Sequence, residues 1–68
     1  MTPHLIIKKL RLALSLEQAE FGKEFDVTAG TVSNWESGRR VPRLSKVRLM
    51  LALAKKHKIK LSIEDFLT

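Results

Sequence analysis

Cysteine is absent from this chain, which excludes disulfide bonds, thiolate catalysis and thiolate metal sites together. No apolar run reaches the ~18 residues that a membrane-spanning helix needs. The amino-terminal residues also lack the apolar block of a signal peptide, so we expect a cytoplasmic protein. The length of 68 residues predicts a single domain over residues 1–68. Its core should be marginal, because a domain of this size buries only ~60% of the surface that its unfolded chain exposes.

Acidic residues are missing from one long segment of a chain whose net charge is +6. Up to residue 36, four basic residues face five acidic ones. The segment from residue 39 to residue 60 has nine basic residues and no Asp or Glu: Arg39, Arg40, Arg43, Lys46, Arg48, Lys55, Lys56, Lys58 and Lys60. Such a one-sided block suits a surface that binds a polyanion. The alternative is a solvated face that keeps the protein soluble, and charge alone does not separate the two.

Strand patterns are also missing, and apolar residues recur at helical spacing along the whole chain. The sequence therefore predicts an all-α bundle of five short helices. Thr2 can cap the first helix, and Pro3 suits its first position. The residues expected to face inward from this helix are Ile6, Leu10, Ala13 and Leu14.

The next two helices lie close together, which predicts a sharp corner between them. The first of the two should follow Ser15, whose hydroxyl fits a capping box with Gln18. Its expected contact residues are Ala19, Phe21, Gly22 and Phe25. Asp26 breaks the pattern, and Thr28 can cap a helix that runs to Ser37. Gly38 stands where a left-handed helix terminus is expected.

The carboxyl-terminal half predicts a helix over residues 44–57 and a short one that starts at Ser62 with a further capping pattern. The 44–57 helix has more apolar residues than one buried face needs. Together with those that follow, they are Leu44, Val47, Leu49, Met50, Leu51, Leu53, Ala54, Ile59, Leu61, Phe66 and Leu67. The surplus favours a second contact surface and a symmetric dimer. The alternative is a helix surrounded by its neighbours.

The helix between Thr28 and Gly38 has one apolar side and one side of small polar residues. Spacing of ~100° per residue puts Val32 and Trp35 on the apolar side. The opposite side consists of Gly30, Ser33, Asn34 and Ser37, flanked by Ala29 and Thr31. Glycine in a helix costs ~1 kcal/mol relative to alanine, but a bare surface lets the backbone come close to a partner. An α-helix fits the DNA major groove, where Asn can pair with adenine and a methyl group can contact thymine.

The stretch "LEQAEFGKEFDVTAGTVSNWESGRRVP", residues 16–42, resembles the Cro/repressor-type (XRE-like) helix-turn-helix family. The matching features are Gln18, Phe21-Gly22, Thr28, Val32, the run from Trp35 to Arg40, and Pro42. The resemblance implies a lambda-repressor-like domain whose 29–37 helix enters the major groove of double-stranded DNA. Asp26 replaces the usual turn glycine, yet Asp tolerates the left-handed conformation better than most residues, so the corner should be kept.

The resemblance also assigns roles to individual residues. The expected base-contacting residues are Ala29, Gly30, Ser33 and Asn34. The expected phosphate-contacting residues are Gln18, Thr31, Arg39, Arg40 and Arg43, although Gln18 can instead serve only the capping box. Arg11 and Glu36 are expected to form an internal ion pair. Because the base-reading side lacks long Gln or Arg side chains, sequence preference should depend partly on methyl contacts, water and DNA shape.

The sequence thus predicts a DNA-binding transcriptional regulator, and no enzyme. It would repress transcription by binding a palindromic operator as a homodimer. The alternative is an antitoxin that neutralises a toxin by contact and also binds its own promoter. No cofactor or metal site is expected, because His4 and His57 are isolated and lack ligand-like spacing. We expect Trp35 to belong to the core rather than to stack on bases, and Glu36 to orient Arg11 rather than to act as an acid.

Overall fold

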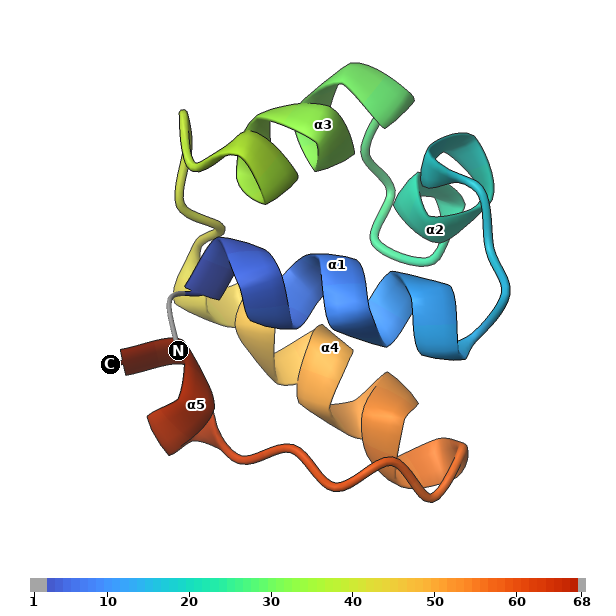
Figure 1. Ribbon diagram of the computed structural model, residues 1–68, viewed down its shortest axis with the longest axis vertical. Helices are drawn as coiled ribbons and strands as arrows, with labels where there is room; N and C mark the ends of the chain where they lie inside the picture. The colour runs from blue at the N-terminus through green and yellow to red at the C-terminus, as the bar shows by residue number, and fades with distance from the viewer. Residues whose placement is uncertain (1–2, 68) are drawn as a thin grey trace.

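The computed structural model describes residues 3–67, and these form five helices and no strand. The helices are α1 (Pro3–Ala13), α2 (Gln18–Lys23), α3 (Ala29–Ser37), α4 (Leu44–Lys56) and α5 (Ile63–Leu67). Figure 1 shows α2 and α3 together at one end of the molecule, α1 across the middle, and α5 toward the other end. The predicted all-α bundle is confirmed. The expected cap Thr2 and the side chain of Leu67 lie outside the described residues.

The predicted capping box between Ser15 and Gln18 is wrong. Ser15 adopts a left-handed conformation (φ 57°) and donates its backbone N–H to the Leu12 carbonyl at 3.0 Å, so it belongs to the end of α1. Glu17 is the N-cap of α2 instead, and the carboxylate of Glu20 accepts the Glu17 backbone N–H at 3.0 Å. The capping box at the start of α2 is therefore formed by Glu17 and Glu20, and not by Ser15 and Gln18.

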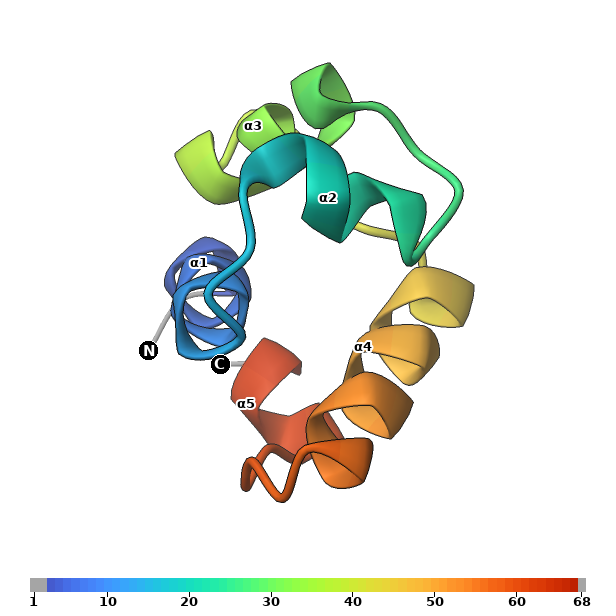
Figure 2. The ribbon, with the colours of Figure 1, turned by 90° about the vertical axis from the view of Figure 1, so that its right-hand side faces the viewer.

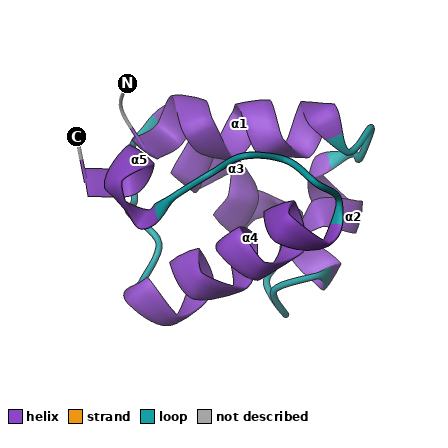
Figure 3. Cartoon of the chain, turned by 90° about the horizontal axis from the view of Figure 1, so that it is seen from below, coloured by secondary structure: helices purple, strands orange, loops and turns teal. Residues whose placement is uncertain are grey.

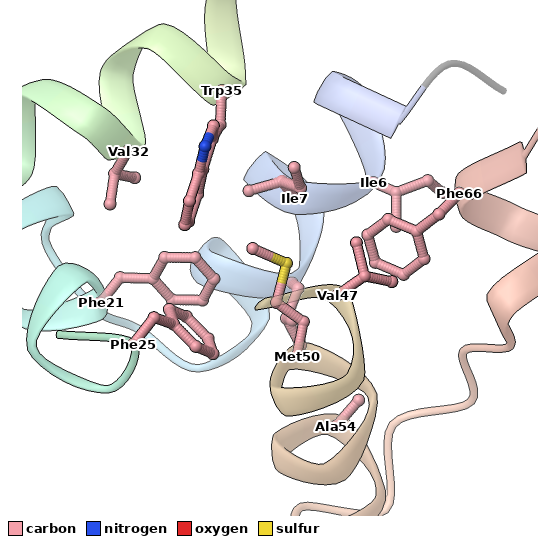
Figure 4. Packing of buried hydrophobic residues seen from close by; sticks show 11 residues of the cluster. Ile6, Ile7, Phe21, Phe25, Val32, Trp35, Val47, Met50, Ala54 and Phe66 are labelled. Atoms are coloured by element: carbon pink, nitrogen blue, oxygen red, sulfur yellow. The ribbon is translucent and has the colours of Figure 1, made fainter. Parts of the chain in front are cut away.

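The core lies between all five helices, and its largest fully buried side chains include Phe21, Phe25 and Ile7. Figure 4 shows Val32 and Trp35 pointing from α3 toward the two phenylalanines. The Phe25 ring meets the rings of Phe21 and Trp35 edge-on, at centroid distances of 4.8 and 6.3 Å. Such edge-to-face pairs stabilise beyond the area that they bury. Trp35 is thus a core residue, as predicted, and joins α3 to the end of α2.

Two predicted contact residues lie outside this core. Ala13 is exposed because it is the last residue of α1, at the edge of a buried face made by Ile6, Ile7 and Leu10. The prediction missed Ile7, which completes that face. Ala19 is exposed because α2 buries Phe21 and Gly22 instead.

Helix α4 is only partly covered by its neighbours. It buries Val47, Met50 and Ala54, whereas Leu44 and Leu49 are about half exposed (53% and 47%). Figure 2 shows α1 and α4 on either side of the core. Figure 3, seen from below, shows the loop from α4 to α5 crossing between α1 and α4 on the side nearest the viewer. The apolar surplus of the 44–57 segment is therefore divided between the core and the surface.

Candidate nucleic-acid interface

Helix α3 presents its small polar side to the outside, and local hydrogen bonds fix where the helix begins. Thr28 has extended backbone angles, and its Oγ1 accepts the Thr31 backbone N–H at 3.2 Å. This is the predicted N-cap. Val32 is fully buried and Trp35 nearly so, whereas Gly30 and Ser33 on the opposite side are exposed. The outer side of α3 is therefore accessible to a partner along its length.

The three glycines differ in what an added Cβ would meet. At Gly30 the nearest atom would be Thr28 Oγ1 at 3.7 Å, an ordinary van der Waals contact. At Gly22 a Cβ would come within 2.6 Å of the Val27 carbonyl oxygen, so only glycine allows α2 to pack this close to the turn. Gly38 has φ 82°, the left-handed terminus that the sequence predicted. Packing within the chain thus explains Gly22 but leaves Gly30 unexplained.

The corner between α2 and α3 is kept despite the departure at the turn. Asp26 adopts the left-handed conformation (φ 56°), as expected of a residue that replaces glycine there. Val27 donates its backbone N–H to the Gly22 carbonyl at 2.9 Å. Lys46 of α4 donates from Nζ to the Phe25 carbonyl oxygen at 2.6 Å, next to the turn. By charge alone Lys46 is one of the basic residues of the 39–60 segment, and no local pattern marks it as a residue that fixes the corner.

An ion pair joins α1 to the last turn of α3. Arg11 Nε and Glu36 Oε2 lie 2.6 Å apart, and Arg11 Nη2 donates to Glu36 Oε1 at 3.0 Å. The side chains are 11% and 7% exposed. The hydrogen bond to Glu36 raises the pKa of the Arg11 guanidinium above its ordinary value, although burial acts in the opposite direction. Arg11 also donates from Nη1 to the Leu16 carbonyl at 2.9 Å, so the pair fixes the start of α2 as well.

Gln18 lies beside this ion pair. Its Nε2 donates to Glu36 Oε1 at 3.2 Å, so its amide group is held at the junction of α2 and α3. The capping role predicted for Gln18 is filled by Glu20. Gln18 is partly exposed at the first position of α2.

The arginines that follow α3 are attached to its end by backbone hydrogen bonds. Gly38 donates its N–H to the Trp35 carbonyl at 3.3 Å, and Arg40 donates its N–H to the Asn34 carbonyl at 3.2 Å. The side chains of Arg39 and Arg40 are exposed directly after the outer side of α3. Arg43 is exposed further along, at the N-cap of α4. The loop therefore places two guanidinium groups next to α3 and a third at the start of the following helix.

The structure brings the expected contact residues together around α3. Gly30 and Ser33 are exposed, and Ala29, Thr31 and Asn34 are partly exposed. The Thr31 hydroxyl lies 3.2 Å from Thr28 Oγ1, so one hydrogen bond of that hydroxyl stays within the helix start. None of these five residues belongs to the core cluster.

Other kinds of site find little support in the described part of the chain. Residues 3–67 contain no group of three or more His, Asp or Glu side chains that could hold a metal ion. Every helix in the same range is too short or too polar to span a bilayer.

The family model described as helix-turn-helix, of the XRE type, matches residues 7–61, which is well over half of the chain. Neither a curated protein nor a solved structure gives a match. The family binds DNA and is typically non-enzymatic. The matched range includes α2, the corner, α3, the arginine loop and α4. The chain belongs to the Cro/XRE-type helix-turn-helix family and is a DNA-binding regulator.

Proposed function

We propose that this protein is a transcriptional repressor that binds a palindromic operator as a homodimer, with α3 in the major groove. The observation that carries the proposal is the open position at Gly30, where a Cβ would meet nothing closer than 3.7 Å. The fold itself does not require glycine at this position, but a partner that approaches the helix backbone would. In this family, that partner is duplex DNA.

Base contacts are assigned to Ala29, Gly30, Ser33 and Asn34, which share the accessible side of α3. Asn34 has the amide group that can form two hydrogen bonds with adenine, and Ala29 offers a methyl group for thymine. No long side chain occupies this side, so each base contact requires the helix to lie deep in the groove. DNA shape and bridging water supply the remaining preference.

Phosphate contacts are assigned to Gln18, Thr31, Arg39, Arg40 and Arg43, which border that side of α3. Arginine suits this role because its planar guanidinium can donate two parallel hydrogen bonds to one phosphate. Such contacts set the register of the protein on the duplex without reading its sequence. Gln18 would contact phosphate with the part of its amide that Glu36 leaves available.

The homodimer is supported by Leu44 and Leu49, which stay about half exposed on α4. Two recognition helices must lie about one DNA turn apart to bind two half-sites, and a second copy supplies the second helix. The same exposed leucines are the observation that favours the alternative function, in which a toxin covers them and the protein acts as its antitoxin. Both functions include DNA binding through α3.

Selection of binding sites from random duplex DNA tests the proposal. A repressor of this kind should enrich a two-fold symmetric site with half-sites ~10 base pairs apart. The mass of the purified complex should then correspond to two protein copies per duplex. Enrichment of no sequence, or of an asymmetric site bound by one copy, would contradict the dimer. If Leu49→Ser lowers the complex from two protein copies per duplex to one, the leucines join two copies; if two copies per duplex remain, the leucines are free for another protein.

A further inference from the structure

The basic residues that begin and end the 39–60 segment lie at opposite ends of the molecule. Arg39 and Arg40 follow α3, whereas Lys55 belongs to the last turn of α4 and Lys60 to the loop after it. Figures 1 and 2 show α3 and this loop at opposite ends of the fold. Arg43 and Lys55 are twelve positions apart along α4, which corresponds to about 18 Å at ~1.5 Å per residue. That distance exceeds the Debye length of ~8 Å at physiological ionic strength, so a duplex on α3 does not account for the distant lysines.

These lysines border an open groove between α4 and the loop that leads to α5. The groove encloses about 520 Å³. Its floor includes Leu51, Ile59 and Leu61, which are half-buried against the core. Lys55, Lys58 and Lys60 line it as well, and all three are exposed. No Asp or Glu is among the described residues that line the groove.

We infer that this groove docks an acidic amphipathic segment of a partner protein. A helix with apolar side chains three and four residues apart would place them on the leucine and isoleucine floor. Its carboxylates would then lie opposite the lysine ammonium groups, whose apolar stems extend the floor. The groove lining has three lysines and no acidic residue, so a partner segment with complementary charge must be acidic. The inference does not depend on repression or on the operator.

Other occupants fit the groove less well. A second copy that placed the same groove on the two-fold axis would bring the same three lysines of both copies together. DNA phosphates would bind the lysines, but they would make no favourable contact with the apolar residues of the groove. A lipid bilayer takes up apolar side chains that protrude from a surface, whereas Leu51, Ile59 and Leu61 are half-buried and pack against the core. An acidic segment with apolar anchors uses both features.

The test compares two triple variants of the full chain. The groove variant is Lys55→Gln, Lys58→Gln, Lys60→Gln, and the matched control is Lys8→Gln, Lys9→Gln, Lys23→Gln. All six lysines are exposed, and both variants lose three positive charges. The probe is a fluorescent synthetic peptide about four helical turns long, with Leu at three- and four-residue spacing and Glu elsewhere. A second probe has the same composition in scrambled order. Affinity is measured by fluorescence anisotropy at low and at physiological salt, after thermal melting has shown that both variants are folded.

We expect the groove variant to bind the first probe about tenfold more weakly than the control variant does, since three exposed charge pairs are lost. Wild-type protein should prefer the ordered probe to the scrambled one, and saturating probe should shift the NMR signals of Leu51 and Leu61. Equal binding by the two variants would overturn the inference, because net charge alone would then explain the affinity. So would equal binding of the two probes, or groove-dependent binding of phosphatidylserine vesicles or of a second duplex in place of the peptide. A groove variant that sediments as a smaller oligomer than the control would assign the groove to a second copy, and would also overturn it.

Discussion

Replacement of Gly30 should change stability and DNA binding in opposite directions. In the free protein, the added methyl group of Gly30→Ala would contact only Thr28 Oγ1, at 3.7 Å. Alanine is favoured over glycine within a helix by ~0.5–1 kcal/mol. For a domain of this size, 1 kcal/mol corresponds to ~4–8 °C in melting temperature. The variant should therefore melt roughly 2–8 °C higher than the wild type.

Binding to the selected operator should weaken in the same variant. If the backbone at Gly30 lies against base edges, the added methyl group overfills a packed contact, which typically costs ~1–3 kcal/mol. The dissociation constant should then rise roughly 5- to 150-fold. Gly30→Leu, with a longer side chain at the same open position, should abolish specific binding while the domain remains folded. Thermal melting by circular dichroism and anisotropy with labelled operator measure the two effects.

Gly22→Ala is the control for a glycine that packing requires. Its Cβ would lie 2.6 Å from the Val27 carbonyl oxygen, so this variant should melt at a lower temperature and lose DNA binding through loss of structure. The reasoning on Gly30 fails if Gly30→Ala lowers the melting temperature, or if the variant binds the operator as tightly as the wild type. The first result would make Gly30 a packing residue, and the second would remove it from the interface.

The other assignments lead to four further predictions. Replacing Arg39 and Arg40 with Ala should weaken binding to every duplex alike. In a salt titration, the slope of log K against log salt should fall in magnitude by about 2, at ~0.9 per phosphate contact. An effect confined to one DNA sequence would contradict the phosphate assignment. Asn34→Ala should lose ~1–3 kcal/mol of discrimination at one base position in a repeated site selection, and an unchanged profile would remove Asn34 as a base reader. Arg11→Met leaves the Glu36 carboxylate, 7% exposed, without its main partner, and should cost ~3 kcal/mol or more in urea unfolding. Because Glu36 raises the pKa of Arg11, the wild-type pair should keep its contribution as the pH rises through the neutral range, and a loss of stability there that the variant lacks would contradict this.

The helix-turn-helix was predictable because its signals are local. Thr28, Val32, Trp35 and Gly38 each determine their own part of α3 through a cap, a buried position or a left-handed terminus, and the structure places all four as expected. Helical periodicity likewise separated the buried side of α3 from its accessible side.

The start of α2 was predicted less well because two candidate caps compete. Serine has the higher intrinsic preference for the N-cap position, which favoured Ser15. The backbone needs Ser15 in a left-handed conformation to end α1, and this leaves Glu17 as the cap. Ile7 was missed because the predicted buried face of α1 was too narrow. The buried face of α1 is wide enough to include it, since α3 and α5 both pack against α1.

The roles of the individual basic residues in the 39–60 segment could not be predicted from the sequence, because α4 carries the chain from one end of the molecule to the other. Its first part supplies Arg39 and Arg40 beside α3, and its last part lines the groove at the far end. Between them, Lys46 turns inward and binds the Phe25 carbonyl at the corner of the helix-turn-helix. One run of like charges thus supplies a proposed DNA contact, an internal hydrogen bond and a proposed docking surface. If this division is correct, the variant that neutralises the distant lysines should bind the operator at least as tightly as the variant that neutralises Lys8, Lys9 and Lys23. Each triple variant loses the same charge, and neither removes an arginine beside α3.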